Sequence, residues 1–181
     1  MTRYRFFTAT SLDGFLADEH ESLDWLLSQP TDAEQSILPY DVFVQDVGAI
    51  VTGRATYDWV VGHLETVADA WVYDQPTFVF SHRELPEDFT GITRVSGPPA
   101  AHRARLEEVA GDKDVWIVGG GDLAFSFAEA GMLDEVFVSI APVTLGSGKP
   151  LMGGRLDLEL RELGRNGALL EARFAVTGAR S

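Results

Sequence analysis

The chain contains no cysteine, and lysine and arginine together make up only 14 of its 181 residues. Without cysteine there can be no disulfide, no thiolate metal ligand and no cysteine nucleophile, and we expect a reducing, cytoplasmic location. Aspartate and glutamate number 28, which gives a formal net charge of -14. A surface of this sign repels nucleic acid and anionic membranes, so the sequence predicts neither as a partner.

Other absences narrow the class further. No stretch is long and apolar enough for a transmembrane helix, and no secretory h-region is recognised. The four histidines have no paired metal-ligand spacing and there is no G-x-S-x-G elbow, so we expect neither a bound metal nor a serine nucleophile of that kind. A hydrophobic content of 45% is typical of a globular protein, and the length predicts one domain over residues 1–181.

Strand-like and helix-like segments alternate through most of the chain, which predicts an α/β fold with a mostly parallel sheet. Asn166-Gly167 separates two alternating runs and indicates a hairpin, so the sheet should end in an antiparallel edge. The predicted strands cover residues 4–11, 49–52, 77–80, 92–95, 115–118, 134–141, 156–160 and 168–176. The predicted helices cover 32–47 (capped by Thr31, with a kink or late start at Pro39), a segment from about 56, 98–110 and 123–130.

The most informative segment runs from Asp114 to Ala124, where an apolar β-branched stretch ends in three glycines before a helix. Such a junction presents bare backbone N–H groups and a helix N-terminus to an anion, usually a phosphate. Gly119, Gly121 and Ala124 also satisfy the G-x-G-x-x-G/A dinucleotide pattern. The run lies late in the chain and no ribose-binding acid follows it, so the segment predicts a phosphate cradle but not a Rossmann NAD domain.

Two polar segments follow predicted strands. Gly53 would let the backbone approach a ligand closely, and Arg54 can make bidentate bonds to a phosphate. A plain strand–helix turn with a surface arginine is the alternative. Ser81, His82 and Arg83 supply a hydroxyl, an imidazole and a guanidinium without an acid, which favours a ribose 2′-phosphate over a free 2′-hydroxyl. An ordinary polar loop is the alternative there.

Residues 11–17 are predicted to end the first strand and begin a loop, with a turn at Gly14. Leu16 and Ala17 are apolar or small, which suits a nicotinamide face. An ordinary turn capped by Asp13 is the alternative.

These segments together resemble the dihydrofolate reductase-like fold, and more closely the reductase domain of the bifunctional riboflavin-biosynthesis deaminase–reductase. The matching residues come in that family's order over nearly the whole chain: Ser11-Leu12-Asp13-Gly14, Asp24-Trp25-Leu26, Gly53-Arg54-Ala55-Thr56-Tyr57, Gly119-Gly120-Gly121-Asp122-Leu123-Ala124 and Ala141-Pro142-Val143-Thr144-Leu145-Gly146-Ser147-Gly148. The resemblance implies a stand-alone NADPH-dependent reductase with a three-layer α/β fold. It also implies a homodimer.

The resemblance further implies which residues would hold NADPH. Three would pack near the nicotinamide: Ala9, Leu16 and Ala17. The glycine run would line the pyrophosphate through Gly119, Gly120, Gly121, Asp122 and Leu123. The adenosine phosphate side would be held by Arg54, Thr56, Ser81, His82 and Arg83, next to the turn at Gly53.

Reduction of a heterocycle or carbonyl needs a proton as well as a hydride. Dihydrofolate reductases carry one carboxylate on the first helix, and residues 38–42 resemble that segment, which makes Asp41 the first candidate acid. A solvated helix acid is the alternative. Asp13, at the mouth of the first strand, is the second candidate. Three aromatic residues could stack on a flat substrate, although core packing is the usual role of such residues: Trp25, Tyr57 and Phe125.

Two classes of function remain open. The first is a reductase that uses NADPH on a pterin-like, pyrimidine or other flat carbonyl or imine compound. It would be of the 5-amino-6-(5-phosphoribosylamino)uracil reductase type or, alternatively, would have dihydrofolate reductase activity. The second is an NADPH-binding protein that has lost turnover. A phosphoribosyl substrate would need a basic pocket, which the sequence does not clearly supply.

Overall fold

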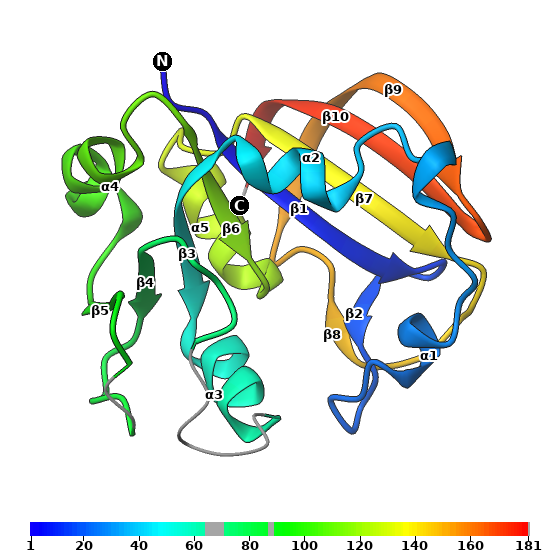
Figure 1. The fold of residues 1–181 in the computed structure, drawn as a ribbon, viewed down its shortest axis with the longest axis horizontal. Helices are drawn as coiled ribbons and strands as arrows, with labels where there is room; N and C mark the ends of the chain where they lie inside the picture. The colour runs from blue at the N-terminus through cyan, green and yellow to red at the C-terminus, as the bar shows by residue number, and fades with distance from the viewer. Residues whose placement is uncertain (64–70, 87–88, 181) are drawn as a thin grey trace.

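In a computed structural model, which describes residues 1–63, 71–86 and 89–180, the chain folds around an eight-stranded sheet (Figure 1). The strand order is β5-β4-β3-β6-β1-β7-β10-β9. Neighbours from β5 to β7 are parallel, and β10 and β9 are antiparallel. The bounds are β1 Tyr4–Ser11, β3 Val47–Gly53, β4 Thr77–Phe80, β5 Ile92–Val95, β6 Asp114–Val118, β7 Glu135–Ala141, β9 Arg155–Asn166 and β10 Leu169–Arg180. The predicted mostly parallel sheet with a C-terminal antiparallel hairpin is confirmed.

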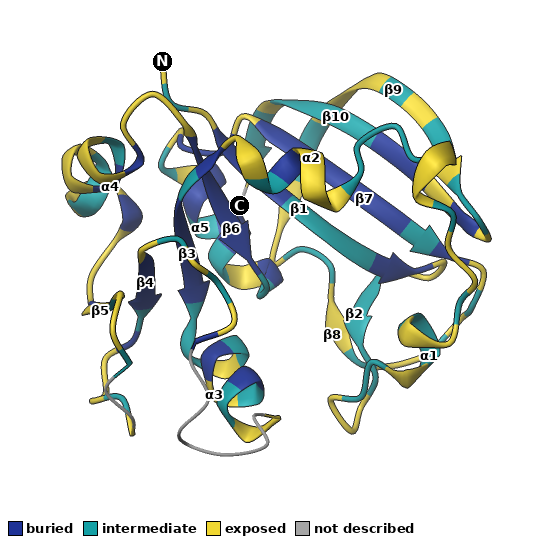
Figure 2. Cartoon of the chain, viewed as in Figure 1, coloured by how far each residue is buried: buried dark blue, intermediate teal, exposed yellow. Residues whose placement is uncertain are grey.

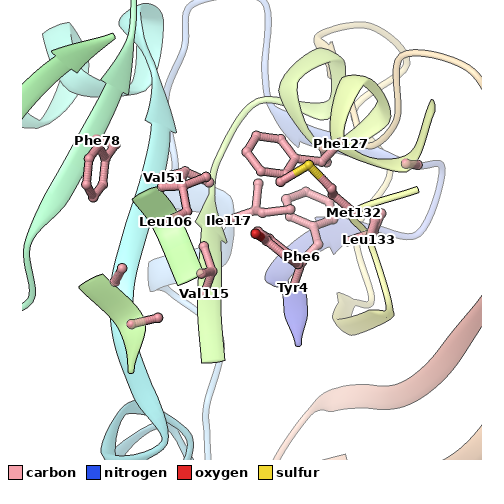
Figure 3. Packing of buried hydrophobic residues seen from close by; sticks show 14 of the residues in the cluster. Tyr4, Phe6, Val51, Phe78, Leu106, Val115, Ile117, Phe127, Met132 and Leu133 are labelled. Carbon is pink, nitrogen blue, oxygen red and sulfur yellow. The ribbon is translucent and has the colours of Figure 1, made fainter. Parts of the chain in front are cut away.

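Helices cover both faces of the sheet, because alternate residues of the central strands are apolar on both sides. Val115 and Ile117 of β6 belong to the same core as Leu106 of α4 (Arg103–Ala110) and Phe127 of α5 (Gly121–Glu129) (Figure 3). The intervening Trp116 and Val118 pack instead with Phe43 of α2 (Tyr40–Gln45). Helix α3 (Arg54–Gly62) packs on the α2 side, through Tyr57 and Val60 against Val79. The result is a three-layer α/β arrangement.

The two strands at the middle of the sheet lead to opposite faces. The chain leaves β1 toward α2, and it leaves β6 toward α5, although β1 and β6 are neighbours. Figure 1 shows α2 in front of the sheet and α5 behind it. A crevice opens where adjacent parallel strands diverge in this way, outside their carboxyl ends. The glycine run follows β6 at that edge.

The predicted helix over residues 32–47 is confirmed only in its second half, with the late start at Pro39. The structure has a single 3₁₀ turn, η1 (Ala33–Gln35), then an extended stretch, and α2 begins after Pro39; the last predicted residue belongs to β3. Pro39 lacks an N–H and forces the residue before it out of the helical region. The Ser36 hydroxyl and the Ile37 N–H donate to buried Glu171, at 2.9–3.0 Å, which holds the stretch extended. The cap of η1 is Asp32 rather than Thr31.

The loop predicted over residues 11–17 is also partly wrong. Gly14, with φ +87°, reverses the chain, and Phe15–Ala17 then form β2, which pairs antiparallel with β8 (Lys149–Pro150). A strand of three residues is too short to show a hydrophobic period. One turn of helix, α1 (Asp24–Leu27), follows.

The remaining elements lie close to their predicted positions. The helix predicted over 98–110 is a 3₁₀ turn, η2 (Pro99–His102), that continues into α4. The hairpin is confirmed, but its two-residue turn is Gly167-Ala168, one residue later than the Asn166-Gly167 pair that indicated it. The positive φ of +60° falls on the glycine, as a type II′ turn requires. Figure 2 shows the inner strands β3, β4 and β6 largely buried and β9 mixed. Among the described residues, no helix is long and apolar enough to cross a bilayer.

Candidate active-site cleft

A cleft of about 390 Å³ opens at the carboxyl ends of β1 and β6. Its floor is formed by strand ends and by the glycine run, and its walls come from β2, the turn before α1, α3 and β8. The residues that line it are Phe7, Thr8, Ala9, Leu16, Ala17, Glu21, Leu23, Leu26, Ala55, Thr56, Trp59, Val60, Tyr73, Val118, Gly119, Gly120, Gly121, Asp122, Lys149 and Pro150.

Two helix N-termini begin beside each other at this edge of the sheet. Helix α3 has Gly53 as its N-cap and α5 has Gly120, and neither cap makes a side-chain hydrogen bond. The preceding strands are neighbours, since Thr52 is in register with Val118. The first N–H groups of a helix have no carbonyl partner within it, and the helix dipole adds positive potential. The pair of uncapped ends therefore suits an anionic group such as a pyrophosphate.

Each glycine of the run also has a structural reason. Gly119 and Gly120 have φ values of +69° and +75°, which side chains rarely adopt. A Cβ on Gly119 would collide with the Thr56 hydroxyl, and one on Gly121 would lie 2.6 Å from the carbonyl oxygen of Pro150. The run thus lets α3, α5 and the β8 segment approach one another around the cleft.

The structure brings together most of the residues that the resemblance implies for the nicotinamide and pyrophosphate. Ala9, Leu16, Ala17 and 119–122 all line the one cleft, and Thr56, which was implied for the adenosine phosphate side, lines this cleft as well. Ser81, His82 and Leu123 line a neighbouring cavity of about 530 Å³, formed by the ends of β4 and β5 and by α5. An extended dinucleotide could therefore run from the cleft across the start of α5 to this second cavity. The binding roles themselves stay predictions.

Arg54 and Arg83 lie elsewhere. They line a third cavity, of about 870 Å³, outside α3, which shares Glu21 and Trp59 with the cleft. The Arg54 guanidinium is already engaged, because Nε donates to Asp58 Oδ1 at 2.6 Å and Nη1 to the Glu84 carbonyl at 2.8 Å. A phosphate contact by Arg54 would have to share or replace these bonds.

The loop that carries Arg83 is closed on itself. The Ser81 hydroxyl donates to the Arg83 carbonyl at 2.7 Å and accepts from the Arg83 N–H at 3.1 Å. The side chains of His82 and Arg83 are exposed. Both can therefore reach toward a ligand without breaking the turn.

The two candidate acids do not line the cleft. Asp41 is exposed on α2. The Asp13 carboxylate accepts from the N–H groups of Leu145 and Gly146, at 2.8–3.1 Å, and from the Ser11 hydroxyl at 2.6 Å. These hydrogen bonds, that of Ser11 above all, lower the pKa of Asp13 to about 2. Asp13 is therefore ionised at neutral pH and anchors the loop that leads to β8, and the geometry does not favour it as a proton donor.

The three candidate stacking residues also lie away from the cleft wall. Tyr57 is fully buried and stacks on Trp71 with ring centroids 5.5 Å apart. Phe125 is buried on α5, where its ring fills the space in which a side chain on Gly154 would lie. The Trp25 Nε1–H donates to the Ser22 carbonyl at 3.1 Å within its own turn.

Three aromatic residues line the cleft, and the sequence analysis missed all of them: Phe7, Trp59 and Tyr73. Trp59 lies three positions after Thr56 on α3, so helical spacing could have placed both on one face. Burial raises the pKa of Tyr73 to about 12, so its hydroxyl stays protonated. Glu21 and Lys149 were missed as well, and no local pattern marks them, because they meet only in the folded chain.

Comparison with known proteins gives a consistent result. The model of the RibD C-terminal domain family matches residues 4–168. An uncharacterized Bacillus subtilis protein, YwjB, is 32% identical over 146 residues, covering 80% of this chain and 79% of that protein. A "Putative riboflavin biosynthesis protein" from Shewanella sp. PV-4 has a similar structure, with a TM-score of 0.80, 27% identity, and coverage of 98% of this chain and 99% of that one.

More distant structures share the fold. Dihydrofolate reductase from Enterococcus faecalis, solved with NADP(H), has a TM-score of 0.54 at 12% identity, with 97% of this chain and 96% of that chain covered. The deaminase/5-amino-6-(5-phosphoribosylamino)uracil reductase from Thermotoga maritima has a TM-score of 0.64 at 15% identity. That match covers 97% of this chain and 56% of the bifunctional protein. The resemblance to the riboflavin-pathway reductase domain and the dihydrofolate reductase-like fold are confirmed.

Proposed function

The chain belongs to the RibD C-terminal domain family, and on that premise we propose that it is an NADPH-dependent reductase of a flat heterocyclic, carbonyl or imine compound. One observation carries the proposal. Two uncapped helix N-termini face the cleft, beside an inner end that is lined by small and apolar residues. A cofactor with a pyrophosphate and a flat reactive ring needs both features.

The residues present fit this cofactor. Gly119, Gly120 and Gly121 leave no side chain between the α5 N-terminus and a pyrophosphate. Ala9 and Leu16 offer the inner ring a surface without polar groups. The Ser81 and His82 cavity would take the adenosine end, where a hydroxyl and an imidazole without an acid favour the 2′-phosphate of NADPH. When bound, NADPH supplies the hydride, and the chain supplies position and exclusion of water.

The proton has several possible sources around the cleft. Its lining offers the hydroxyls of Thr8, Thr56 and Tyr73 and the charged groups of Glu21 and Lys149. A water bound by these groups could deliver a proton inside the cleft, whereas Asp41 does not line the cleft. Asp41 and Asp13 therefore remain candidates from the sequence alone, and we place the proton source among the groups that line the cleft.

Titration of the purified protein with NADPH and NADH, followed by calorimetry, tests the cofactor. We expect saturable binding with a preference for NADPH. Loss of NADPH absorbance on addition of dihydrofolate or pyrimidine ribosylamines then tests turnover. Binding of neither dinucleotide would overturn the proposal, and binding of NADPH without turnover of any acceptor would favour a binding protein.

We also propose that the protein is a homodimer, with the edge of the hairpin in the interface. Four leucines of β9 and β10 are 42–59% exposed: Leu158, Leu160, Leu163 and Leu170. Their register places them on one face of the sheet, at its outer edge, where exposed apolar surface and unpaired strand groups favour association. We expect a second copy of the chain to cover this face. Analytical ultracentrifugation at micromolar concentration should therefore show a dimer, and a monomer would contradict the proposal.

A further inference from the structure

The cleft holds little charge for its size. Its substrate side is walled by apolar and aromatic side chains, namely Phe7, Leu23, Leu26, Trp59 and Tyr73. The charged residues among the described lining are Glu21, Asp122 and Lys149, with no arginine. Residues 64–70, 87–88 and 181, which lie outside the described ranges, include no lysine, arginine or histidine in the sequence. They can therefore add no cation to the cleft.

Glu21 is fixed at the rim by two independent anchors. Its backbone has φ +60°, the sole positive value among the described non-glycine residues. The Asp18 carboxylate accepts from the N–H groups of His20 and Ser22, at 2.8–2.9 Å, and so shapes this turn. From the other side, Trp59 Nε1 donates to the Glu21 carbonyl at 3.0 Å, which ties the turn to α3. A non-glycine residue in this conformation often serves a functional site.

Lys149 is placed opposite Glu21 by the short β2–β8 pair, in which it is in register with Ala17. Its Nζ lies 2.9 Å from Glu21 Oε1, and the two side chains, 58% and 54% exposed, form an ion pair at the rim of the cleft. With Asp122 included, the described lining carries one net negative charge.

The adjoining cavity does not reverse this balance. It contains Arg54 and Arg83, but also the carboxylates of Asp24, Asp58 and Glu21. Arg54 is paired with Asp58. A phosphate monoester carries a charge of about −1.5 to −2 at neutral pH and is bound by free arginine, lysine or backbone donors. Neither cavity offers it an unpaired cluster of cations.

We propose that the cleft selects an uncharged planar ring without a phosphate, and that Glu21 is the residue that sets this specificity. This rests on the proposed reductase function and names its substrate class. Trp59 and Tyr73 supply flat apolar surface for the ring. Glu21 occupies Lys149 in an ion pair, so this lysine competes poorly as a phosphate ligand, and Asp122 leaves the lining with a net negative charge that repels a phosphorylated form.

A matched pair of probes tests the proposal: 5-amino-6-(5-phosphoribosylamino)uracil and the same compound without its phosphate. Calorimetry is done on the protein with and without NADP⁺. We expect the unphosphorylated probe to bind about tenfold more tightly, a difference of the size that one close like-charge contact produces. Equal affinity, or tighter binding of the phosphorylated probe, would overturn the proposal.

The Glu21→Gln variant assigns the effect to one side chain. Removing this charge frees Lys149, so the affinity for the phosphorylated probe should rise about fivefold to tenfold while that for the other probe changes less than about twofold. Glu19→Gln is the control, since Glu19 is exposed nearby and does not line the cleft. If the two variants behave alike, Glu21 does not set specificity.

The same titrations separate this inference from the proposed function. Failure to bind NADP⁺ or NADPH overturns the reductase proposal. The relative affinity of the cofactor-free protein for the two probes supports or overturns the proposed substrate class, whether or not the protein binds the dinucleotide.

Discussion

The two ends of the parallel sheet are built on opposite principles. At the amino ends of the strands, Arg5 is only 5% exposed, and its Nε and Nη2 donate to Glu135 Oε1 at 2.8 and 2.6 Å. Asp114 accepts from Arg3 at 2.6 Å and from Arg5 at 3.5 Å. The Arg5 guanidinium also lies 4.8 Å from the centre of the Phe43 ring. At this end Arg5, Asp114 and Glu135 are buried and paired with one another, and the half-exposed Arg3 joins them from outside.

At the carboxyl ends of the same strands, two helix N-termini are left without a side-chain cap. The helices that start there have glycine caps and no side-chain hydrogen bond to the cap, and a cleft separates the surrounding elements. The two ends of the same strands therefore have different roles, one in the stability of the fold and one in the shape of the cleft. Polar groups satisfied within the chain fix the fold, whereas polar groups left open provide a place for a ligand.

The largest expected effect comes from breaking the closed end. Arg5→Ala would leave Glu135 and Asp114 with less compensation in a buried site, and we expect a loss of about 3–5 kcal/mol in the free energy of unfolding. Urea denaturation measures it. Arg161→Ala is the control, because its ion pair with Glu159 is half exposed and should contribute less than about 1 kcal/mol. Equal losses would mean that the buried network does not fix the fold.

A change at the open end should cost less stability. Gly119→Ala introduces a Cβ that meets Thr56, at a φ of +69°, and we expect a loss of about 2–3 kcal/mol together with weaker NADPH binding. Gly131→Ala has nearly the same φ, +62°, but nothing within 4 Å of its Cβ, so it should lose only about 1 kcal/mol. Denaturation of the two variants side by side isolates the Thr56 contact, and identical losses would argue against it.

The phosphate assignment predicts a selective effect on affinity. If Arg54 exchanges its bonds to Asp58 and Glu84 for the 2′-phosphate and Arg83 reaches it from the neighbouring loop, Arg54→Ala combined with Arg83→Ala should weaken NADPH binding about tenfold, about 1.4 kcal/mol, and leave NADH binding nearly unchanged. Calorimetric titration with both dinucleotides measures this. Equal losses for the two would remove these arginines from the 2′-phosphate site.

The smallest effect concerns Asp13 and pH. Its folded pKa of about 2 lies below the ordinary 3.8, so its hydrogen bonds stabilise the loop fully above about pH 4 and are lost as the pH falls through 2. Amide exchange at Leu145 and Gly146 should therefore show no added opening between pH 5 and 8. Asp13→Asn should speed exchange at these two amides at neutral pH, whereas Asn in place of exposed Asp112 should not. Unchanged exchange in Asp13→Asn would show that the carboxylate does not hold the loop.

Local signals were sufficient for most of the fold. The β-branched run before Gly119 and the turn at Gly167 depend on near neighbours in the chain, and the strands and hairpin they predict are present. The first half of the helix predicted over 32–47 is absent because Glu171, far along the chain, binds Ser36 and Ile37. A pattern confined to the segment cannot report that contact.

The site was harder to predict than the fold. The glycine run and residues 16–17 were recognised by type and order, and they do line one cleft. Trp59, Glu21 and Lys149 come from a helix, a turn and a two-residue strand, and only their tertiary arrangement brings them together. The identity of the proton donor depends on the same arrangement, so a search for acids along the sequence led to groups outside the cleft.

The position of β6 has a consequence for synthesis. Strand β6 lies between β3 and β1 in the sheet, yet it is made after both. A nascent chain that ends before Asp114 can pair β3 with β4 and β4 with β5, but it cannot join these strands to β1. Strand β6, which joins β3 to β1, therefore leaves the ribosome late, and the glycine run follows it immediately. The ligand cleft can be assembled only once translation has passed that point.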